Sequence, residues 1–208
     1  MKPETKYWLK LGILFLALGG LIFSVYKIIK YFIDSNNTKA QITEIETIFG
    51  SFSDEEKTSE LSTEAICDKI DALKEKNADI IGCIQVKNTN INFPFVQTTD
   101  NKYYLNHSLD KTENSAGWAF LDYRNSSALN DRNNIIYGHG RFDLTMFGTM
   151  KTMLEEDWLE NLDNLIIHTS NKTESKEWQI FSIYIIPTTS DYLAIDFDSD
   201  DEALSFFN

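Results

Sequence analysis

Three histidines and two cysteines are the side chains of this sequence best suited to proton transfer or covalent catalysis: His107, His139, His168, Cys67 and Cys83. No two histidines have the spacing of a helical metal site, and neither a His-Glu-x-x-His nor a Cys-x-x-Cys pattern occurs. The serine-nucleophile elbow, the phosphate-binding loop and the dinucleotide fingerprint are also absent from the sequence. We therefore expect no metal and no cofactor. We expect His107 in a solvent-facing polar turn and His168 at the end of a strand.

His139 has the most suggestive surroundings. It follows a short apolar run, Ile135–Tyr137, and lies between Gly138 and Gly140, so we expect a strand that ends in a Gly-His-Gly turn. Flanking glycines let the backbone turn sharply and leave the imidazole open to a substrate. An imidazole at the rim of a sheet can transfer protons near neutral pH, although an ordinary turn histidine explains the spacing equally well.

Short apolar runs separated by turn residues begin at Ile80 and predict a mainly β body. The candidate strands are Ile80–Val86, Phe93–Val96, Trp118–Leu121, Asn134–Tyr137, Leu165–Thr169 and Trp178–Ile186. Two short helices are expected between strands, at Met146–Leu154 and Glu155–Leu162.

Two helices are expected before the β body, at Thr38–Phe49 and Ser53–Asn77, the second with a capping-box glutamate three residues after Ser53. Ser199–Glu202 has the same capping spacing, with acids in the first turn, close to the last residue of the sequence. This pattern leaves two interpretations open, a frayed tail or a sequence that stops before its domain does.

The N-terminal segment has the composition of a single membrane-spanning helix. Leu11–Tyr26 contains no charged residue, and its apolar neighbours extend it toward the roughly 20 residues that cross a bilayer. A cleaved signal peptide would need a small-residue site after this run, which Val25–Ile29 does not provide, and lysines at both edges argue against a buried soluble helix. The lysines before the run outnumber those after it, which predicts a cytoplasmic N-terminus and an external body.

The charge of the chain divides into a basic head and an acidic body. The chain has 19 Lys and Arg against 32 Asp and Glu, a net charge of -13, although residues 1–33 hold five lysines and one glutamate. Nucleic acid is not an expected partner, because phosphate binding needs clustered cations. The expected organisation is a cytoplasmic N-terminus at 1–6, a membrane anchor at 7–33, a linker with helices at 34–79 and a β domain at 80–208.

Six short sequence motifs, one of which contains His139, follow one another along the chain. They are Phe93–Gln97, Asp100–His107, Ala116–Asn125, Asn133–Gly140, Met146–Met150 and Ile180–Tyr184. In combination they resemble the class B sortases, the membrane-anchored cysteine transpeptidases of Gram-positive bacteria. The resemblance runs from about residue 40 to the end. It implies a mainly β fold, a sortase-like β-barrel with two N-terminal helices and short inserted helices, preceded by a transmembrane helix.

The resemblance also implies a chemistry and a set of partners. In this family a cysteine thiolate attacks the threonyl carbonyl of a C-terminal sorting-signal peptide, and an amine of a cell-wall precursor releases the thioacyl-enzyme. A histidine handles the protons and an arginine steadies the oxyanion. His139 matches the histidine, and Asn101, Leu105 and Tyr137 match positions that line the substrate groove. The implied location is the cell membrane, with one membrane span and an extracellular catalytic domain.

One departure from the family concerns the nucleophile. The family cysteine lies in a Thr-Leu-x-Thr-Cys strand after the histidine, with the arginine beyond it. No cysteine follows His139 here, and Arg141 follows too closely to be that arginine. Cys67 and Cys83, placed in a helix and a strand, are expected to be buried and unreactive.

We therefore expect an incomplete sortase chain that lacks its catalytic cysteine and arginine because of truncation, a frameshift or a disrupted gene. Such a chain should be inactive alone. Two alternatives are a non-catalytic membrane-anchored module that binds sorting-signal peptides or cell-wall precursors, and a membrane-anchored structural protein that shares only the fold.

Overall fold

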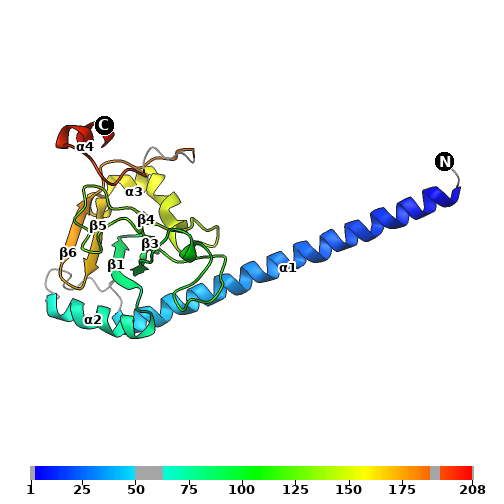
Figure 1. The fold of residues 1–208 in the computed structure, drawn as a ribbon, viewed down its shortest axis with the longest axis horizontal. Helices are drawn as coiled ribbons and strands as arrows, with labels where there is room; N and C mark the ends of the chain where they lie inside the picture. The colour runs from blue at the N-terminus through cyan, green and yellow to red at the C-terminus, as the bar shows by residue number, and fades with distance from the viewer. Residues whose placement is uncertain (1–2, 50–62, 188–192, 208) are drawn as a thin grey trace.

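The computed structural model describes residues 3–49, 63–187 and 193–207 of the chain. Its longest element is the helix α1, Pro3–Phe49, which projects far beyond the rest of the molecule (Figure 1). At 1.5 Å per residue its 47 residues extend for about 70 Å. Most apolar residues from Tyr7 to Ile33 are exposed, whereas Asp34, Ser35 and Thr38 are buried against the body. The N-terminal part of α1 is long and apolar enough to cross a membrane.

A separate helix beginning at Thr38, within a linker that starts at residue 34, was expected from the sequence. This expectation was wrong, because α1 continues through it. The buried polar groups there have partners in the body. Asn114 Nδ2 lies 3.2 Å from both the carbonyl oxygen of Asp34 and the hydroxyl of Thr38, so the polar face of the helix is satisfied without a loop.

The body is built on one six-stranded mixed sheet with the order β4-β3-β2-β1-β5-β6. The strands are β1 (Ile80–Val86), β2 (Asn92–Val96), β3 (Phe120–Leu121), β4 (Ile136–Tyr137), β5 (Ile166–Asn171) and β6 (Ser175–Gln179). β2 and β3 pair in parallel, and the other neighbours pair antiparallel. The fold is therefore mainly β in its body, as the sequence predicted, with β1 matching its predicted bounds.

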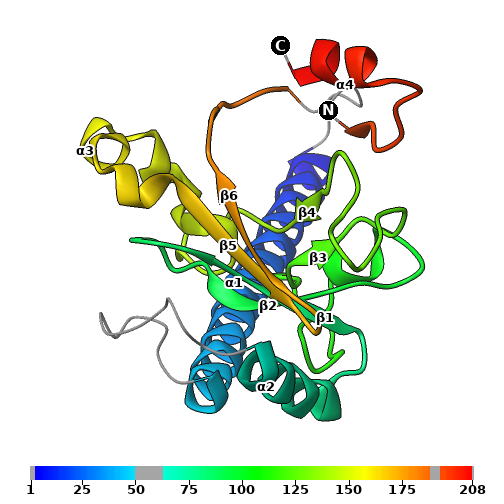
Figure 2. The same cartoon turned by 90° about the vertical axis from the view of Figure 1, so that its left-hand side faces the viewer.

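Helices cover the sheet and connect its strands. α2 (Thr63–Lys76) lies beside the end of α1, under the sheet (Figure 2). The 3-10 helices are η1 (Tyr103–Leu105), η2 (Phe147–Leu154) and η3 (Leu162–Leu165), and the remaining α-helices are α3 (Glu156–Glu160) and α4 (Asp200–Phe207). Both predicted inserted helices are thus present. The one predicted at Met146–Leu154 is the 3-10 helix η2, and the one predicted at Glu155–Leu162 is the shorter α3. The expected cap at Ser53 lies outside the described residues.

The predicted last strand, Trp178–Ile186, was too long. β6 ends at Gln179, which pairs with Ile166, the first residue of β5. The backbone N–H of Ile180 still donates to the carbonyl oxygen of Leu165, just before β5, at 2.8 Å. Beyond Ile180 no further strand pairing is seen among the described residues, and several apolar side chains are exposed, including Phe181 and Ile185. An apolar sequence becomes a strand only where a neighbouring strand supplies hydrogen-bond partners.

The core lies between the sheet, α2 and the end of α1. Phe93, Phe95, Trp118 and Ile80 are among its largest buried side chains. The indole N–H of Trp118 donates to the carbonyl oxygen of Pro94 at 2.8 Å, so its one polar group is satisfied inside the core.

Candidate functional site

His139 lies on a loop that follows β4 and is fastened at both ends. The backbone N–H of Phe147 donates to the carbonyl oxygen of His139 at 3.0 Å, and Gly140 forms an isolated β-bridge with Met146. A Cβ added to Gly138 would lie 2.6 Å from the Phe147 ring, so the absence of a side chain at Gly138 lets that ring close the loop. Both glycines were expected to allow a sharp turn. The structure instead requires glycine at position 138 because the Phe147 ring packs against its backbone.

The imidazole of His139 has a defined orientation. Its Nε2 lies 2.9 Å from the carbonyl oxygen of Leu105, and a carbonyl oxygen can only accept, so Nε2 carries the proton. This tautomer leaves Nδ1 as the nitrogen that can take up a further proton. The ring is half-buried, which keeps it accessible from one side.

Gly117 fixes the backbone on which Leu105 lies. Its φ of +60° is in the left-handed region, and an added Cβ would lie 2.4 Å from the carbonyl oxygen of Tyr104 and 2.9 Å from that of Leu105. The N–H of Trp118 donates to the carbonyl oxygen of Tyr104 at 2.9 Å. Only glycine combines this dihedral with so close an approach, and η1 is thereby held against the start of β3.

The candidate groove residues Asn101 and Tyr137 meet at a third residue, Asp122. The Asp122 side chain has no solvent exposure, and its Oδ2 accepts from Asn101 Nδ2 at 2.8 Å and from Tyr137 Oη at 2.9 Å. The guanidinium of Arg124 donates to both carboxylate oxygens, at 2.9 and 2.8 Å, and the Arg124 backbone N–H also donates to Oδ1 at 2.9 Å. Asp122 therefore receives five hydrogen bonds from three residues.

The electrostatics of this cluster follow from its hydrogen bonds. Burial disfavours the charged form of Asp122, but the hydrogen bonds from Arg124, Tyr137 and Asn101 outweigh it and hold the pKa of the carboxyl well below its usual range. Burial and the hydrogen bond to Asp122 raise the pKa of Tyr137 to about 12. Tyr137 is consequently a neutral hydrogen-bond donor at physiological pH, and Asp122 is an anion.

The loop after His139 is attached to α1. The Arg141 guanidinium lies 4.3 Å from the ring centroid of Tyr31 and pairs with Asp143 at 3.1 Å. Burial opposes ionisation of Asp143, but hydrogen bonds from Arg141, Ser35 and Thr145 dominate and lower the pKa of its carboxyl. Arg141 thus has a structural role, and the long helix is part of the scaffold that holds the histidine loop.

The other two histidines have separate surroundings. His107 was expected in solvent, but it is half-buried, with its ring stacked on Tyr103 at a centroid distance of 4.0 Å. Its Nδ1 lies 2.8 Å from the carbonyl oxygen of Tyr103. His168 lies within β5, and its Nδ1 is 3.6 Å from Glu177 on β6. Among the described residues, neither ring forms a hydrogen bond with His139.

The described thiol is not available for catalysis. Cys83 lies in β1, and burial raises its pKa far above that of a free thiol. Its register partners are Pro94 and Ser170, on the strands to either side. The side chain of Cys67 lies outside the described part. Among the described residues, no group of three or more His, Cys, Asp or Glu could hold a metal ion.

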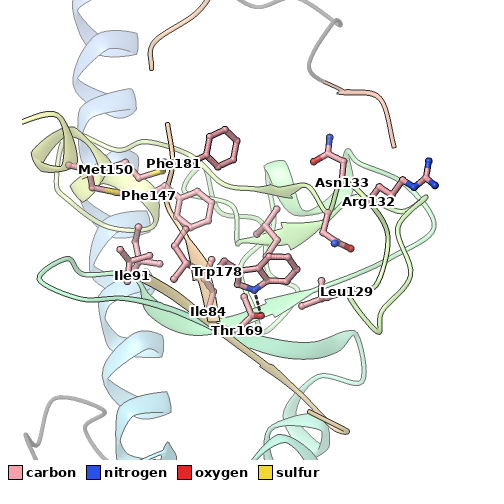
Figure 3. A pocket seen from close by; sticks show the side chains of 15 residues that line it. Ile84, Ile91, Leu129, Arg132, Asn133, Phe147, Met150, Thr169, Trp178 and Phe181 are labelled. Atoms are coloured by element: carbon pink, nitrogen blue, oxygen red, sulfur yellow. Dashed lines mark hydrogen bonds between the residues drawn. The ribbon is translucent and has the colours of Figure 1, made fainter. Parts of the chain in front are cut away.

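An apolar cavity of about 580 Å³ opens between the two outer strands of the sheet (Figure 3). Ile136 of β4 and Trp178 of β6 line it from opposite ends of the strand order, with Ile84 of the central β1 and Phe147. The indole N–H of Trp178 donates to the hydroxyl of Thr169 at 2.8 Å, which orients the ring along the wall. Phe181 remains 78% exposed at the rim. The cavity adjoins the histidine loop through Phe147.

The four residues expected to form the site thus lie on two segments, 101–105 and 137–139, that meet at β3 and at Asp122 directly after it. His139 contacts Leu105, and Tyr137 and Asn101 share Asp122. Sequence reasoning missed Asp122 as the centre of the cluster. The sequence does show that Asp122 follows the apolar run Trp118–Leu121 and lies two residues before Arg124. That pattern does not reveal which other side chains hydrogen-bond to Asp122.

The similar proteins and the similar solved structures all belong to one family. No protein-family model matches the sequence. The chain is 28% identical over 188 residues to sortase B of Staphylococcus aureus, covering 90% of this chain and 74% of that protein. It is 29% identical over 197 residues to sortase B of Listeria monocytogenes, covering 93% and 75%.

Solved structures extend the agreement to the fold. The crystal structure of sortase B from B. anthracis in complex with AAEK1 is 32% identical, with a TM-score of 0.69 over 85% of this chain and 79% of that one. A complex of S. aureus sortase B with substrate is 25% identical, with a TM-score of 0.69 over 86% and 77%. The mainly β sortase-like fold predicted from the sequence is thereby confirmed.

Proposed function

The chain belongs to the sortase B family of cysteine transpeptidases, which attach surface proteins to the cell wall, and from this premise we propose roles for its site residues. His139 transfers the protons of the two acyl-transfer steps. Asn101, Leu105 and Tyr137 line the groove that holds the sorting-signal peptide. The observation that carries this proposal is the contact of His139 with Leu105 beside the cluster centred on Asp122.

The proposed proton transfers follow from the orientation of the imidazole. With Nε2–H held by the Leu105 carbonyl, Nδ1 accepts a proton and the resulting imidazolium can return one. In the acylation step a thiolate forms a bond to the threonyl carbonyl carbon, the peptide C–N bond breaks, and the leaving amine takes a proton from imidazolium. In the second step an incoming amine gives a proton to the imidazole as it displaces the thiolate.

The nucleophile is not supplied by the described thiol, because Cys83 is buried in the central strand of the sheet. We propose that a polypeptide of residues 1–208 binds a sorting-signal peptide and does not cleave it. The test is a fluorogenic peptide library with threonine at the cleaved position, assayed for both binding and cleavage. Leu105→Ala and Tyr137→Ala should weaken binding. Cleavage by this polypeptide would contradict the proposed lack of activity, and cleavage that also survived His139→Ala would contradict the role of His139.

The buried thiol also favours a second candidate, a membrane-anchored module that binds sorting-signal peptides or wall precursors without chemistry. The intact mass of the native protein, extracted from its membrane, separates the two. A mass well above 24.0 kDa that no modification explains would favour an enzyme with a further cysteine-bearing segment. A mass of 24.0 kDa would favour the binding module.

We propose that residues 7–33 cross the membrane once, with residues 1–6 in the cytoplasm and the body outside. The support is the exposed apolar surface of α1 and the excess of lysines before it. The proposed partners are the sorting-signal peptide and the wall-precursor amine. Protease protection of residues 1–6 in intact cells, with digestion of the body, would agree with this orientation.

A further inference from the structure

A five-residue turn at 141–145, within the histidine loop, is fastened to α1 at the outer end of the proposed membrane span. The Arg141 guanidinium lies 4.3 Å from the ring centroid of Tyr31, and the side chain of Ser35 hydrogen-bonds the carboxylate of Asp143. Tyr31 and Ser35 lie one helical turn apart on α1, on either side of the end of that span. The turn is therefore held at the height where a membrane surface would meet the body.

The body begins to cover α1 at the same height. Residues 3–29 are exposed apart from Leu11, whereas Lys30 and Tyr31 are half-buried and Asp34 and Ser35 are buried. In Figure 1 the body lies against one end of α1, and the apolar N-terminal part of the helix projects beyond it. The turn at 141–145 therefore lies at the membrane-facing end of the contact between α1 and the body.

This turn exposes its apolar side chains and encloses its polar ones. Phe142 is 88% exposed and Leu144 is also exposed, whereas Arg141 and Thr145 are buried. The Nζ of Lys151 lies 4.3 Å from the centroid of the Phe142 ring. A single exposed apolar side chain is ordinary on a protein surface, but here two share a turn fastened beside the exposed apolar length of α1. An aromatic ring next to a lysine also suits a membrane interface, where the ring enters the lipid and the amine stays among the headgroups.

The backbone of the turn fixes the direction of these side chains. Leu144 has a φ of +64°, in the left-handed region that bulky side chains rarely adopt. Its N–H donates to the carbonyl oxygen of Arg141 at 3.3 Å. The Asp143 carboxylate accepts from the N–H and the hydroxyl of Thr145, at 3.1 and 2.6 Å. Side chains that are already held in place lose little conformational entropy when they enter an apolar phase.

We propose that the turn at 141–145 is a second membrane contact, in which Phe142 and Leu144 enter the lipid interface of the outer leaflet. Lys151 then lies at the level of the headgroups. Together with α1 this contact fixes the tilt of the body, because a single helix leaves the body free to rotate about the helix axis. It also sets the height of His139 above the membrane, because His139 and the turn belong to one fastened loop. The proposal rests on the membrane anchoring proposed above.

The test uses the full chain, with both native cysteines replaced by alanine, in nanodiscs of phosphatidylcholine and phosphatidylglycerol. A single new cysteine carries an environment-sensitive NBD dye. We expect the dye on Phe142→Cys to emit to the blue of its emission in water and to be quenched by lipids that are spin-labelled near the headgroup. Leu162→Cys is the matched control, because Leu162 is 75% exposed on η3, which packs on β5, and its dye should remain in water. Leu18→Cys, within the apolar run of α1, reports the anchor itself.

A second variant tests the contribution of the phenylalanine. Phe142→Asp, added to the labelled Leu144→Cys chain, should lower the ratio of lipid-contacting to water-exposed dye about tenfold, since transfer of one phenylalanine side chain out of water contributes at least that factor. Circular dichroism verifies that each variant is folded.

The outcomes separate the contact from the anchor. A dye at position 142 that stays in water, while the dye at position 18 is quenched, would overturn the contact and leave the anchor standing. A blue shift at position 142 without quenching by lipid would place protein on the turn, such as a second copy of the chain, and would also overturn the proposal. A dye at position 18 that stays in water would refute both the anchor and the contact.

Discussion

Replacing Asp122 by asparagine tests the centre of the candidate site. The substitution keeps the shape of the side chain but removes its charge and turns one acceptor oxygen into a donor. Five donated hydrogen bonds converge on the native carboxylate. In either orientation of the new amide, at least two of the donors from Asn101, Arg124 and Tyr137 lose their acceptor.

The expected loss of stability can be bounded from the geometry. Removing one partner of a buried ion pair costs about 3–5 kcal/mol. The Arg124 side chain is 40% exposed, so its charge can regain water and the cost falls toward the lower limit. We expect a loss of about 3 kcal/mol, which shifts the urea midpoint by about 1.5 M for an m-value of about 2 kcal/mol/M.

The assay is urea unfolding of the full chain in detergent, followed by tryptophan fluorescence. Glu160→Gln, at an exposed position at the end of α3, is the matched control and should change stability by less than about 0.5 kcal/mol. In the Asp122→Asn background, Arg124→Gln should cost less than it does in the wild-type chain, because the ion pair with Asp122 is already lost in either orientation of the amide. A loss within the range of the control would refute the idea that Asp122 organises the site.

Three further outcomes are expected. Because the pKa values of Asp122 and Asp143 are lowered in the folded chain, their stabilisation is complete above the unfolded pKa near 4 and is lost as the pH falls below it. Acid titration of Asp122→Asn should therefore show a shallower loss of stability than wild type below about pH 4, and equal slopes would contradict the assignment. Gly138→Ala should cost about 1–3 kcal/mol by forcing the facing phenylalanine ring to move, whereas Gly140→Ala, with its nearest neighbour at 3.9 Å, should be nearly neutral in the same thermal melt. Cys83, in a chain whose other cysteine is replaced by alanine, should react with iodoacetamide at neutral pH only after unfolding, and rapid labelling of the folded chain would show that burial does not protect it.

The strand pattern was the part of the fold most accessible from sequence. β1 matched its predicted bounds because it is a mostly apolar run between turn residues, with one face fully buried and the other half-buried. The predicted strand after Trp178 failed beyond Gln179 because β5 begins at its partner Ile166, and past the bond from Ile180 to Leu165 no neighbouring strand supplies partners among the described residues. Apolar composition shows that a segment tends to be buried. Whether it forms a strand depends on a neighbouring strand, which only the tertiary structure provides.

The same distinction explains α1. Its apolar N-terminal part was evident from composition, but the polar stretch that follows Ile33 predicted a linker and a separate helix from Thr38. The helix continues because Asn114 and Ser115, about 80 residues away in sequence, hydrogen-bond its buried face. Local propensity cannot include partners so distant in the chain.

The sequence by itself determined the family, the candidate histidine and the two segments that carry the candidate groove residues, because these are properties of local residue order. Tertiary structure alone decided that Asn101 and Tyr137 converge on Asp122, that Leu105 fixes the His139 tautomer, and that α1 holds the histidine loop. Each of these depends on hydrogen bonds between segments far apart in the chain, and such bonds exist only after the sheet has brought the segments together.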